Sequence, residues 1–306
     1  MRALPSVALV LLLASGCSSQ GSLPEPELPA VPGLAAAAST ADVPRTTDRL
    51  TRALDDADGV SVLATIDHSQ NAQRVGMGLA PTRVVVFGNP VVGTPLLQAN
   101  PVVGIDLPQK MLVYQAEDRG TVLAYNTPDY LAARHGLADS PALSALAGAL
   151  DGFARAAAGD QAEIRSTPAS SVTAGQGLVT RVSTISFRDT YSRLREGILL
   201  NGGLSIIAEV DHQANASSVG LSIGPNRLIL FGNPSVGTPL MQASRTAGID
   251  LPQSMLVYQA GGEVRVVYED PAFLAERHQI PTSLEELETI RTVLSQLAER
   301  ALVEAL

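Results

Sequence analysis

The chain has 306 residues, with 21 Lys and Arg against 30 Asp and Glu and a formal net charge of −9. Lys110 is its single lysine, so the clustered basic side chains that bind a phosphate backbone are missing, and we expect no nucleic-acid partner. Cys17 is its single cysteine, which excludes an intramolecular disulfide and a site built from several thiolates.

Residues 1–16 predict an export signal. Arg2 precedes an apolar run that is shorter than the roughly 20 residues a helix needs to span a bilayer. The residues leading into Cys17 resemble a bacterial lipoprotein signal, although Ala14 stands where that pattern prefers leucine. This resemblance implies that Cys17 is acylated, for example with palmitate, and that the exported protein is anchored in the cell envelope. If the cell has two membranes, Ser18 resembles the signal for the outer membrane. The alternative is an ordinary secretory signal with an incidental cysteine.

The remaining chain divides into four parts. A Pro- and Ala-rich tether is predicted over 17–43, a first repeat domain over 44–156, a linker over 157–177 and a second repeat domain over 178–306. The division rests on an internal duplication, because 67–116 and 211–260 are identical at more than half of their positions without a gap. Each copy is long enough to bury its own core.

The second copy shows the clearer pattern of elements. We expect strands over 179–185, 204–210 and 227–231, a helix over 188–200, and a short helix with Thr238 as its N-cap. A hairpin over 255–268, a helix over 271–278 and a final helix opened by a Ser283–Glu286 capping box complete the copy. The first copy repeats this plan, but its opening strand falls in the alanine-rich stretch 33–41, a poor strand former, so this copy is expected to begin irregularly.

These elements predict an α+β fold, with an antiparallel sheet covered by helices on one face in each copy. The string FGNPxVGTPLxQA, followed by GIDLPxxMLVYQA and then by LxxRH, resembles the bacterial family known as domain of unknown function 302 in both copies. That resemblance implies a TATA-box-binding-protein-like fold whose single-domain members form homodimers. It implies no established activity. We therefore expect the two copies to pack together as an internal pseudo-dimer.

Two equivalent Asp-His pairs are the first candidate site: Asp67 with His68, and Asp211 with His212. An imidazole beside a carboxylate suits a general base, a metal ligand or a heme ligand. The structural alternative is an aspartate that caps the following turn and a histidine that bonds a backbone carbonyl. A metal at His68 and His212 needs further ligands from distant residues such as Asp106 or Asp250.

The second candidate is the Gly-Asn-Pro turn that leads into a helix in each copy, with Asn89 and Thr94 in the first and Asn233 and Thr238 in the second. Free amides at such a turn hold an anion such as a carboxylate or phosphate. The alternative is that the turn only directs the backbone. Structural roles are predicted for three further pairs of residues: helix-terminal histidines His135 and His278, turn-capping Asp106 and Asp250, and core tyrosines Tyr114 and Tyr258.

No triad, phosphate-binding or dinucleotide motif is present in the sequence. The leading hypothesis is therefore a non-catalytic, membrane-tethered envelope protein that binds a small ligand or an envelope protein through its repeats. The alternatives are a metal- or heme-dependent activity that uses the Asp-His pairs, and a purely structural spacer. The identity of any cofactor or ligand is unknown at this stage.

Overall fold

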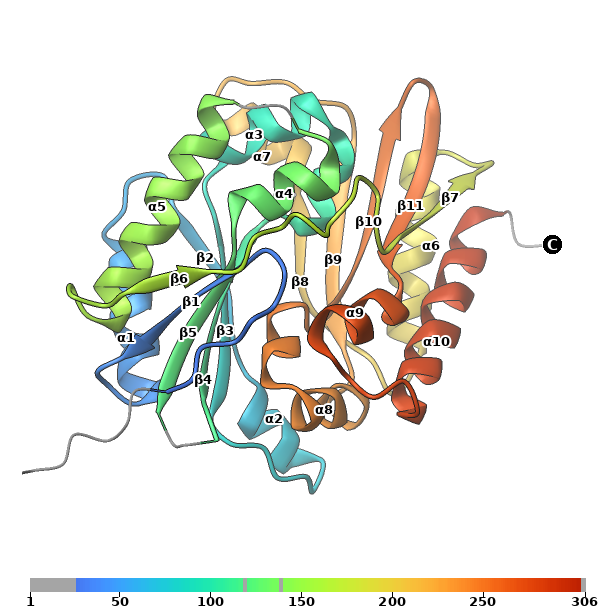
Figure 1. Cartoon of the computed structure of the whole chain (residues 1–306). Helices are drawn as coiled ribbons and strands as arrows, with labels where there is room; N and C mark the ends of the chain where they lie inside the picture. The colour runs from blue at the N-terminus through green and yellow to red at the C-terminus, as the bar shows by residue number, and fades with distance from the viewer. Residues whose placement is uncertain (1–25, 118–119, 138–139, 304–306) are drawn as a thin grey trace, which may run out of the picture.

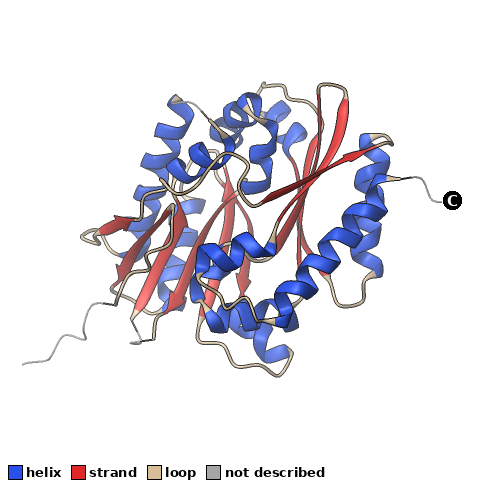
Figure 2. Cartoon of the chain, turned by 45° about the vertical axis from the view of Figure 1, so that its right-hand side comes forward, coloured by secondary structure: helices blue, strands red, loops and turns tan. Residues whose placement is uncertain are grey.

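The computed structural model describes residues 26–117, 120–137 and 140–303. The predicted export signal 1–16 and Cys17 lie outside this range. Within it, two antiparallel sheets form the centre of the molecule, and helices flank them on both sides (Figures 1 and 2). Each sheet belongs to one repeat.

The first sheet has the strand order β2-β3-β4-β5-β1-β6, and the second has the order β7-β11-β10-β9-β8. The two orders match strand for strand, except that β6 extends the first sheet by pairing with β1. The strands of the first sheet are β1 (Leu34–Ser39), β2 (Ser61–Asp67), β3 (Thr82–Gly88), β4 (Gln109–Gln115), β5 (Thr121–Asn126) and β6 (Ile164–Ser166). Those of the second are β7 (Leu178–Ser183), β8 (Ser205–Asp211), β9 (Asn226–Gly232), β10 (Gln253–Ala260) and β11 (Glu263–Glu269).

The helices also correspond in pairs. In the first repeat they are α1 (Val43–Asp55), α2 (His68–Arg74), α3 (Pro90–Ala99), the 3-10 helix η1 (Pro101–Asp106), α4 (Pro128–His135) and α5 (Pro141–Ala158). In the second they are α6 (Phe187–Leu200), α7 (His212–Ser218), α8 (Pro234–Ala243), η2 (Arg245–Ile249), α9 (Pro271–His278) and α10 (Glu285–Leu302). The α+β class, with two sheets and one repeated topology, is therefore confirmed.

Strand alternation divides the buried side chains among three cores. In β4, Met111 and Val113 face helices α1 and α5, while Leu112 and Tyr114 face the other way, into a core shared by both sheets. In β10, Leu256 joins the same shared core. The helix-free faces of the two sheets thus pack toward each other, with η1 and η2 lying between them. The two repeats contact each other within the chain, as the pseudo-dimer hypothesis predicted.

The expectation of an irregular start to the first repeat was wrong. Leu34–Ser39 forms the regular strand β1, which pairs with β5 on one side and β6 on the other. Three of its four alanines, Ala35, Ala36 and Ala37, are at most 2% exposed, because α5 packs over one face of the strand and the core shared by the two sheets covers the other. Tertiary packing here outweighs the low strand propensity of alanine. The predicted tether 17–43 therefore contains a strand of the first sheet, and the predicted linker 157–177 contains β6.

Two predicted helix starts were also wrong. Helix α10 begins at Glu285 after Leu284, and no side chain caps it, so the Ser283–Glu286 capping box does not form. Leu284 takes the cap position because its side chain packs against the core of the second repeat. Helix α8 begins at Pro234 after Asn233, which places Thr238 inside the helix rather than at its N-cap.

Candidate functional site

Both aspartates of the Asp-His pairs are helix caps. Asp67 accepts a hydrogen bond from the backbone amide of Gln70 at 2.8 Å and forms an ion pair with Arg83 at 2.9 Å. Burial opposes ionisation of Asp67, but its hydrogen bonds with Ser69, Gln70 and Arg83 outweigh this effect and lower its pKa. The Asp67 carboxylate forms its hydrogen bonds with these three residues and not with the neighbouring imidazole of His68.

Asp211 repeats this arrangement in the second copy. It accepts a hydrogen bond from the amide of Ala214 at 2.9 Å and forms an ion pair with Arg227 at 2.6 Å. In both copies, the aspartate caps the N-terminus of the helix that follows it, as the structural alternative predicted.

The histidine of each pair enters a pocket of the opposite repeat. His68, together with Asn71 and Arg74 of α2, lines a pocket of about 590 Å³ whose other walls belong almost entirely to the second repeat. His212, together with Asn215 of α7, lines a pocket of about 210 Å³ whose other walls belong almost entirely to the first. We call these the large pocket and the small pocket. Each pocket is complete only because the repeats pack together.

The large pocket contains two buried polar atoms without a hydrogen-bond partner in the described structure: Nε2 of His68 and Oγ1 of Thr238. The two side chains are 6% and 1% exposed. In the small pocket, Nε2 of His212 instead lies 3.3 Å from the carbonyl oxygen of Gly104, which belongs to η1 of the other repeat. The equivalent carbonyl of Gly248 faces the His68 ring and raises its pKa as a hydrogen-bond acceptor does, although it lies beyond ordinary hydrogen-bond geometry from Nε2.

Both imidazoles are neutral at pH 7. Burial lowers the pKa of His68 to about 4, and the charge of Lys110 acts in the same direction, while Asp67 opposes it. Burial also lowers the pKa of His212 to about 4, against the effect of the Gly104 carbonyl. Neither ring therefore contributes a positive charge to its pocket.

The Gly-Asn-Pro turns bring Asn89 and Thr94 into the small pocket, and Asn233 and Thr238 into the large one. The amides that were predicted to hold an anion are already occupied. The side chain of Asn233 accepts a hydrogen bond from the amide of Ser235, and its backbone carbonyl accepts from the amides of Val236 and Gly237. Asn89 makes the same three bonds in the first repeat. Anion binding by these amides is therefore ruled out by the cap itself.

Side-chain differences explain why the pockets are unequal. Phe153 of α5 lines the small pocket and packs edge-on against Phe87, with ring centroids 5.7 Å apart. The equivalent residue of α10 is the smaller Leu297. Within the described part of the chain, Arg74 is the only side chain with a formal charge that lines the large pocket, and its equivalent in the second repeat is Ser218.

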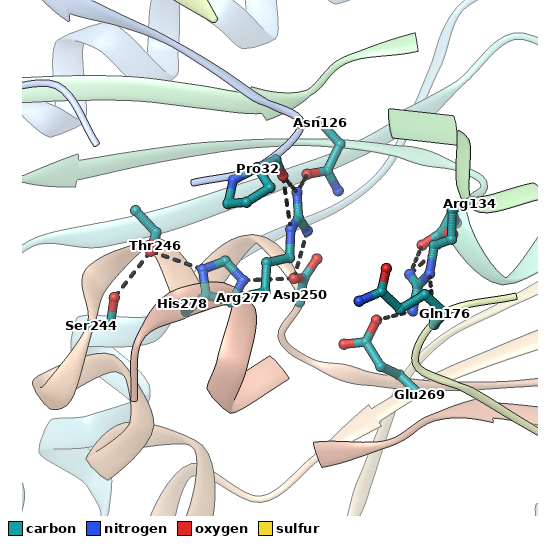
Figure 3. Close-up of polar contacts among 12 residues, drawn as sticks. Pro32, Asn126, Arg134, Gln176, Ser244, Thr246, Asp250, Glu269, Arg277 and His278 are labelled. Atoms are coloured by element: carbon teal, nitrogen blue, oxygen red, sulfur yellow. Dashed lines mark hydrogen bonds and ion pairs between the residues drawn. The ribbon is translucent and has the colours of Figure 1, made fainter. Parts of the chain in front are cut away.

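A buried network of charges lies at the interface between the repeats (Figure 3). In the first repeat, Asp106 accepts hydrogen bonds from Arg134 at 3.0 Å and from His135 Nε2 at 2.6 Å. Burial alone would raise the pKa of Asp106, but Arg134 and His135 lower it to about 2. The prediction that Asp106 is a turn cap was wrong, because its partners stand 28 and 29 residues away in sequence.

The second repeat contains the same arrangement. Asp250 accepts hydrogen bonds from Arg277 at 2.9 Å and from His278 Nε2 at 2.7 Å, so the prediction of a turn cap was wrong here too. Burial opposes ionisation of Asp250, but Arg277 and His278 outweigh it and lower the pKa of Asp250. His135 and His278 do end their helices, yet each is held by a buried carboxylate as well as by its position at the helix terminus.

Each arginine also reaches across to the other repeat. Arg134 donates to the carbonyl of Gln176 and to the carboxylate of Glu269. Arg277 donates to the carbonyl of Pro32 and to the side chain of Asn126. The sequence signal for these two arginines is the LxxRH string present in both copies, but the sequence alone did not assign them a partner.

The two carbonyls point across the interface because a glycine with positive φ follows each of them. Gly33 has φ 71° and Gly177 has φ 70°. A Cβ atom at these positions would lie 2.6 Å from Tyr130 and 2.2 Å from Phe273, respectively. Only glycine fits both the backbone conformation and the space.

His68 and His212 line different pockets, so they do not form one metal site. In the ranges that the structure describes, no group of three or more His, Cys, Asp or Glu side chains is placed to hold a metal ion. Across the same ranges, no helix has the length and apolar character needed to cross a membrane.

Comparison with known proteins gives the following likenesses. The family model described as Domain of unknown function DUF302 matches residues 35–153 and 179–298. Two proteins named fluoride-specific ion channel FluC 1, from Brucella suis biovar 1 (strain 1330) and Brucella abortus biovar 1 (strain 9-941), are 43% identical to this chain over 108 residues. The match covers 35% of this chain and only 42% and 40% of the two relatives, so it spans less than half of their length.

One solved structure carries the same family description. It is an uncharacterized conserved DUF302 protein from Bacillus stearothermophilus, with 20% sequence identity and a TM-score of 0.38. The alignment covers 41% of this chain and 98% of that one.

Proposed function

The chain belongs to the DUF302 family, with two of its domains in tandem, and from this premise we propose that it is a lipid-anchored envelope protein that binds a small molecule between its repeats. The observation that carries this proposal is the large pocket. Its volume of about 590 Å³ falls in the range of about 300–1,000 Å³ that is typical of ligand sites. Such sites are mostly apolar with a few placed polar groups, which is also the character of this lining.

The contacts of the Asp-His pairs favour binding over catalysis. A carboxylate that activates a histidine must bond to its ring, whereas the bonds of Asp67 go to Ser69, Gln70 and Arg83. Among the residues that the structure describes, no acidic side chain lines either pocket. The imidazoles thus serve as neutral polar groups in a pocket wall.

The envelope location rests on the sequence leading into Cys17. Labelling of producing cells with a tagged palmitate, followed by membrane fractionation, tests it. We expect the label on the native chain and a membrane-bound product, and neither with Cys17→Ala. An unlabelled native chain that fractionates with soluble proteins would contradict the anchor.

Ligand binding is tested by screening the purified full chain against small molecules, with thermal stability and native mass spectrometry as readouts. Fluoride belongs in the panel because the proteins matched above are named as fluoride channels. Val293→Phe, which places a bulkier side chain in the large pocket, should abolish the response. The matched Ala149→Phe in the small pocket should leave it intact. A chain that binds nothing in the panel, or a response lost equally in both variants, would favour the spacer hypothesis.

A further inference from the structure

We propose that the large pocket takes one molecule per chain of an apolar compound that carries an uncharged hydrogen-bonding group, a hydroxyl or a carbonyl, seated between His68 and Thr238. This inference rests on the ligand-binding function proposed above and specifies its chemistry.

Two buried polar atoms, Nε2 of His68 and Oγ1 of Thr238, have no partner in ordinary hydrogen-bond geometry among the described residues, and both residues line this one pocket. The Gly248 carbonyl faces the His68 ring from outside that geometry. Folded proteins leave few buried polar atoms unpaired, because each costs the free energy of its lost hydration. Two of them in one pocket, contributed by different repeats, indicate groups kept available for a ligand.

The charges around the pocket favour a neutral ligand. No Asp or Glu of the described residues lines the pocket, so a bound ammonium group would have no counter-ion. Arg74, the single charged lining residue, is exposed at the surface, and its guanidinium already bonds the side chains of Gln70 and Asn71. No charged side chain lines the buried part of the pocket, because burial keeps His68 neutral. The charge of Lys110 acts on His68 from outside the lining, and it faces the carboxylates of Asp250, Asp106 and Glu269. An ionised group seated there would be desolvated without compensation, whereas a hydroxyl or carbonyl would gain hydrogen bonds.

The remaining lining of the pocket fits an apolar ligand body. Around the two polar atoms the lining is dominated by aliphatic and aromatic side chains, including Phe231, Met241, Leu251, Ile290 and Leu294. Burial of an apolar body against them supplies the affinity, and the polar pair supplies orientation.

The two pockets are not equally suited to bind a ligand. The small pocket, at about 210 Å³, is below the usual size of a ligand site, and Phe153 occupies part of it. In this pocket, Nε2 of His212 already has the Gly104 carbonyl as a neighbour at 3.3 Å. The duplicated chain therefore offers one working site, in the large pocket.

Four eight-carbon probes test the proposal: 1-octanol, 2-octanone, octanoate and octylammonium. Their binding to the full chain is measured by calorimetry, with the same buffer and detergent as reference. We expect octanol and octanone to bind at one site per chain, at least about tenfold more tightly than either ion. Thr238→Val should weaken octanol binding by about tenfold, the size of one neutral hydrogen bond, and Thr94→Val should not change it.

Thr238→Val should not lower the unfolding temperature, because the hydroxyl that it removes has no partner. His68→Phe, compared with His212→Phe, provides a second test of the same binding position. We expect octanol binding to be lost in His68→Phe and kept in His212→Phe. Tightest binding by octanoate or octylammonium, two equivalent sites, or an unchanged affinity in Thr238→Val would overturn the inference while leaving ligand binding intact. Failure of all four probes to bind, together with a negative panel screen, would overturn the proposed function and this inference with it.

Discussion

Glu269 in the second repeat takes the place that Asn126 takes in the first, and each accepts a hydrogen bond from the arginine of the opposite repeat. The interface is therefore symmetric in geometry but not in charge. Asp106, Asp250 and Glu269 are nearly buried close to Arg134 and Arg277, and the charge of Lys110 also acts on all three carboxylates. Asp106 and Asp250 each bind an arginine and a histidine, whereas Glu269 shares Arg134 with Asp106.

Glu269→Gln should stabilise the protein at alkaline pH. Burial raises the pKa of Glu269 to about 7 from its ordinary 4.5, and Asp250 and Asp106 add to the effect, while Arg134 opposes it. A raised pKa means that the protonated carboxyl is favoured by folding, so its contribution is full below pH 4.5 and is lost as pH rises through 7.

Glutamine keeps the acceptor for Arg134, as Asn126 does for Arg277, without the charge. We expect a gain on the order of 1–3 kcal/mol in unfolding free energy at pH 8, and little change at pH 4.5, in urea titrations. Equal effects at the two pH values would show that Glu269 does not titrate in this window.

Much of the fold was predictable because it depends on local hydrophobic patterns that occur in both repeats. The alternation in 179–185 and the helical spacing in 271–278 gave elements that the structure confirms as β7 and α9. The strand β1 was placed correctly within 33–41, but its regularity was not predicted, because its stability comes from neighbours on both sides rather than from its alanines.

The site was predictable only in part. His68 and Thr238 stood out in sequence because they recur in each copy, but a repeat does not reveal which copy completes which pocket. Helix α2 packs on α8 of the other repeat, and that contact joins segments far apart in the chain. For the same reason, GIDLP suggested a turn cap, although Asp106 is held by Arg134 and His135 from a distant helix.

Val102→Thr should stabilise the first repeat. Nδ1 of His135 is buried without a partner, whereas Nδ1 of His278 accepts a hydrogen bond from Thr246 at 2.9 Å. Val102 occupies the position equivalent to Thr246. A threonine there offers the missing hydroxyl at nearly unchanged volume, worth about 1 kcal/mol in unfolding free energy.

The reciprocal change, Thr246→Val, should cost about 1–3 kcal/mol, because it leaves Nδ1 of His278 buried and unpaired. Chemical denaturation of both variants at pH 7 measures these effects. If both variants changed the unfolding free energy in the same direction, the hydrogen bond between the threonine hydroxyl and the histidine ring would not be the source of the stability effect.

Acid should destabilise the protein through the pocket histidines. Burial lowers the pKa of His68 and of His212 from 6.5 to about 4. The unfolded chain therefore binds these protons first, so the stability contributed by the neutral rings is full above pH 6.5 and is lost as pH falls toward 4, on the order of 2 kcal/mol per histidine. Protonation of Glu269 stabilises the protein as pH falls over part of this range. The informative quantity is therefore the difference between the variant and the native protein in unfolding free energy at each pH. The double variant His68→Gln/His212→Gln should show a flatter profile between pH 6.5 and 4, and a profile parallel to the native one would refute the assignment.

Phe153→Leu should open the small pocket. The substitution places in α5 the residue that α10 has at the equivalent position, Leu297, and removes the ring that packs against Phe87. Loss of that contact should cost about 1–2 kcal/mol in unfolding free energy. It should also add a second, weaker site for octanol, because the enlarged pocket would resemble the large one in its aliphatic wall. Calorimetric stoichiometry distinguishes the outcomes: two sites indicate that the phenyl ring closes the small pocket. A single site in a less stable protein would indicate instead that the neighbour at His212, the Gly104 carbonyl, keeps the pocket from binding.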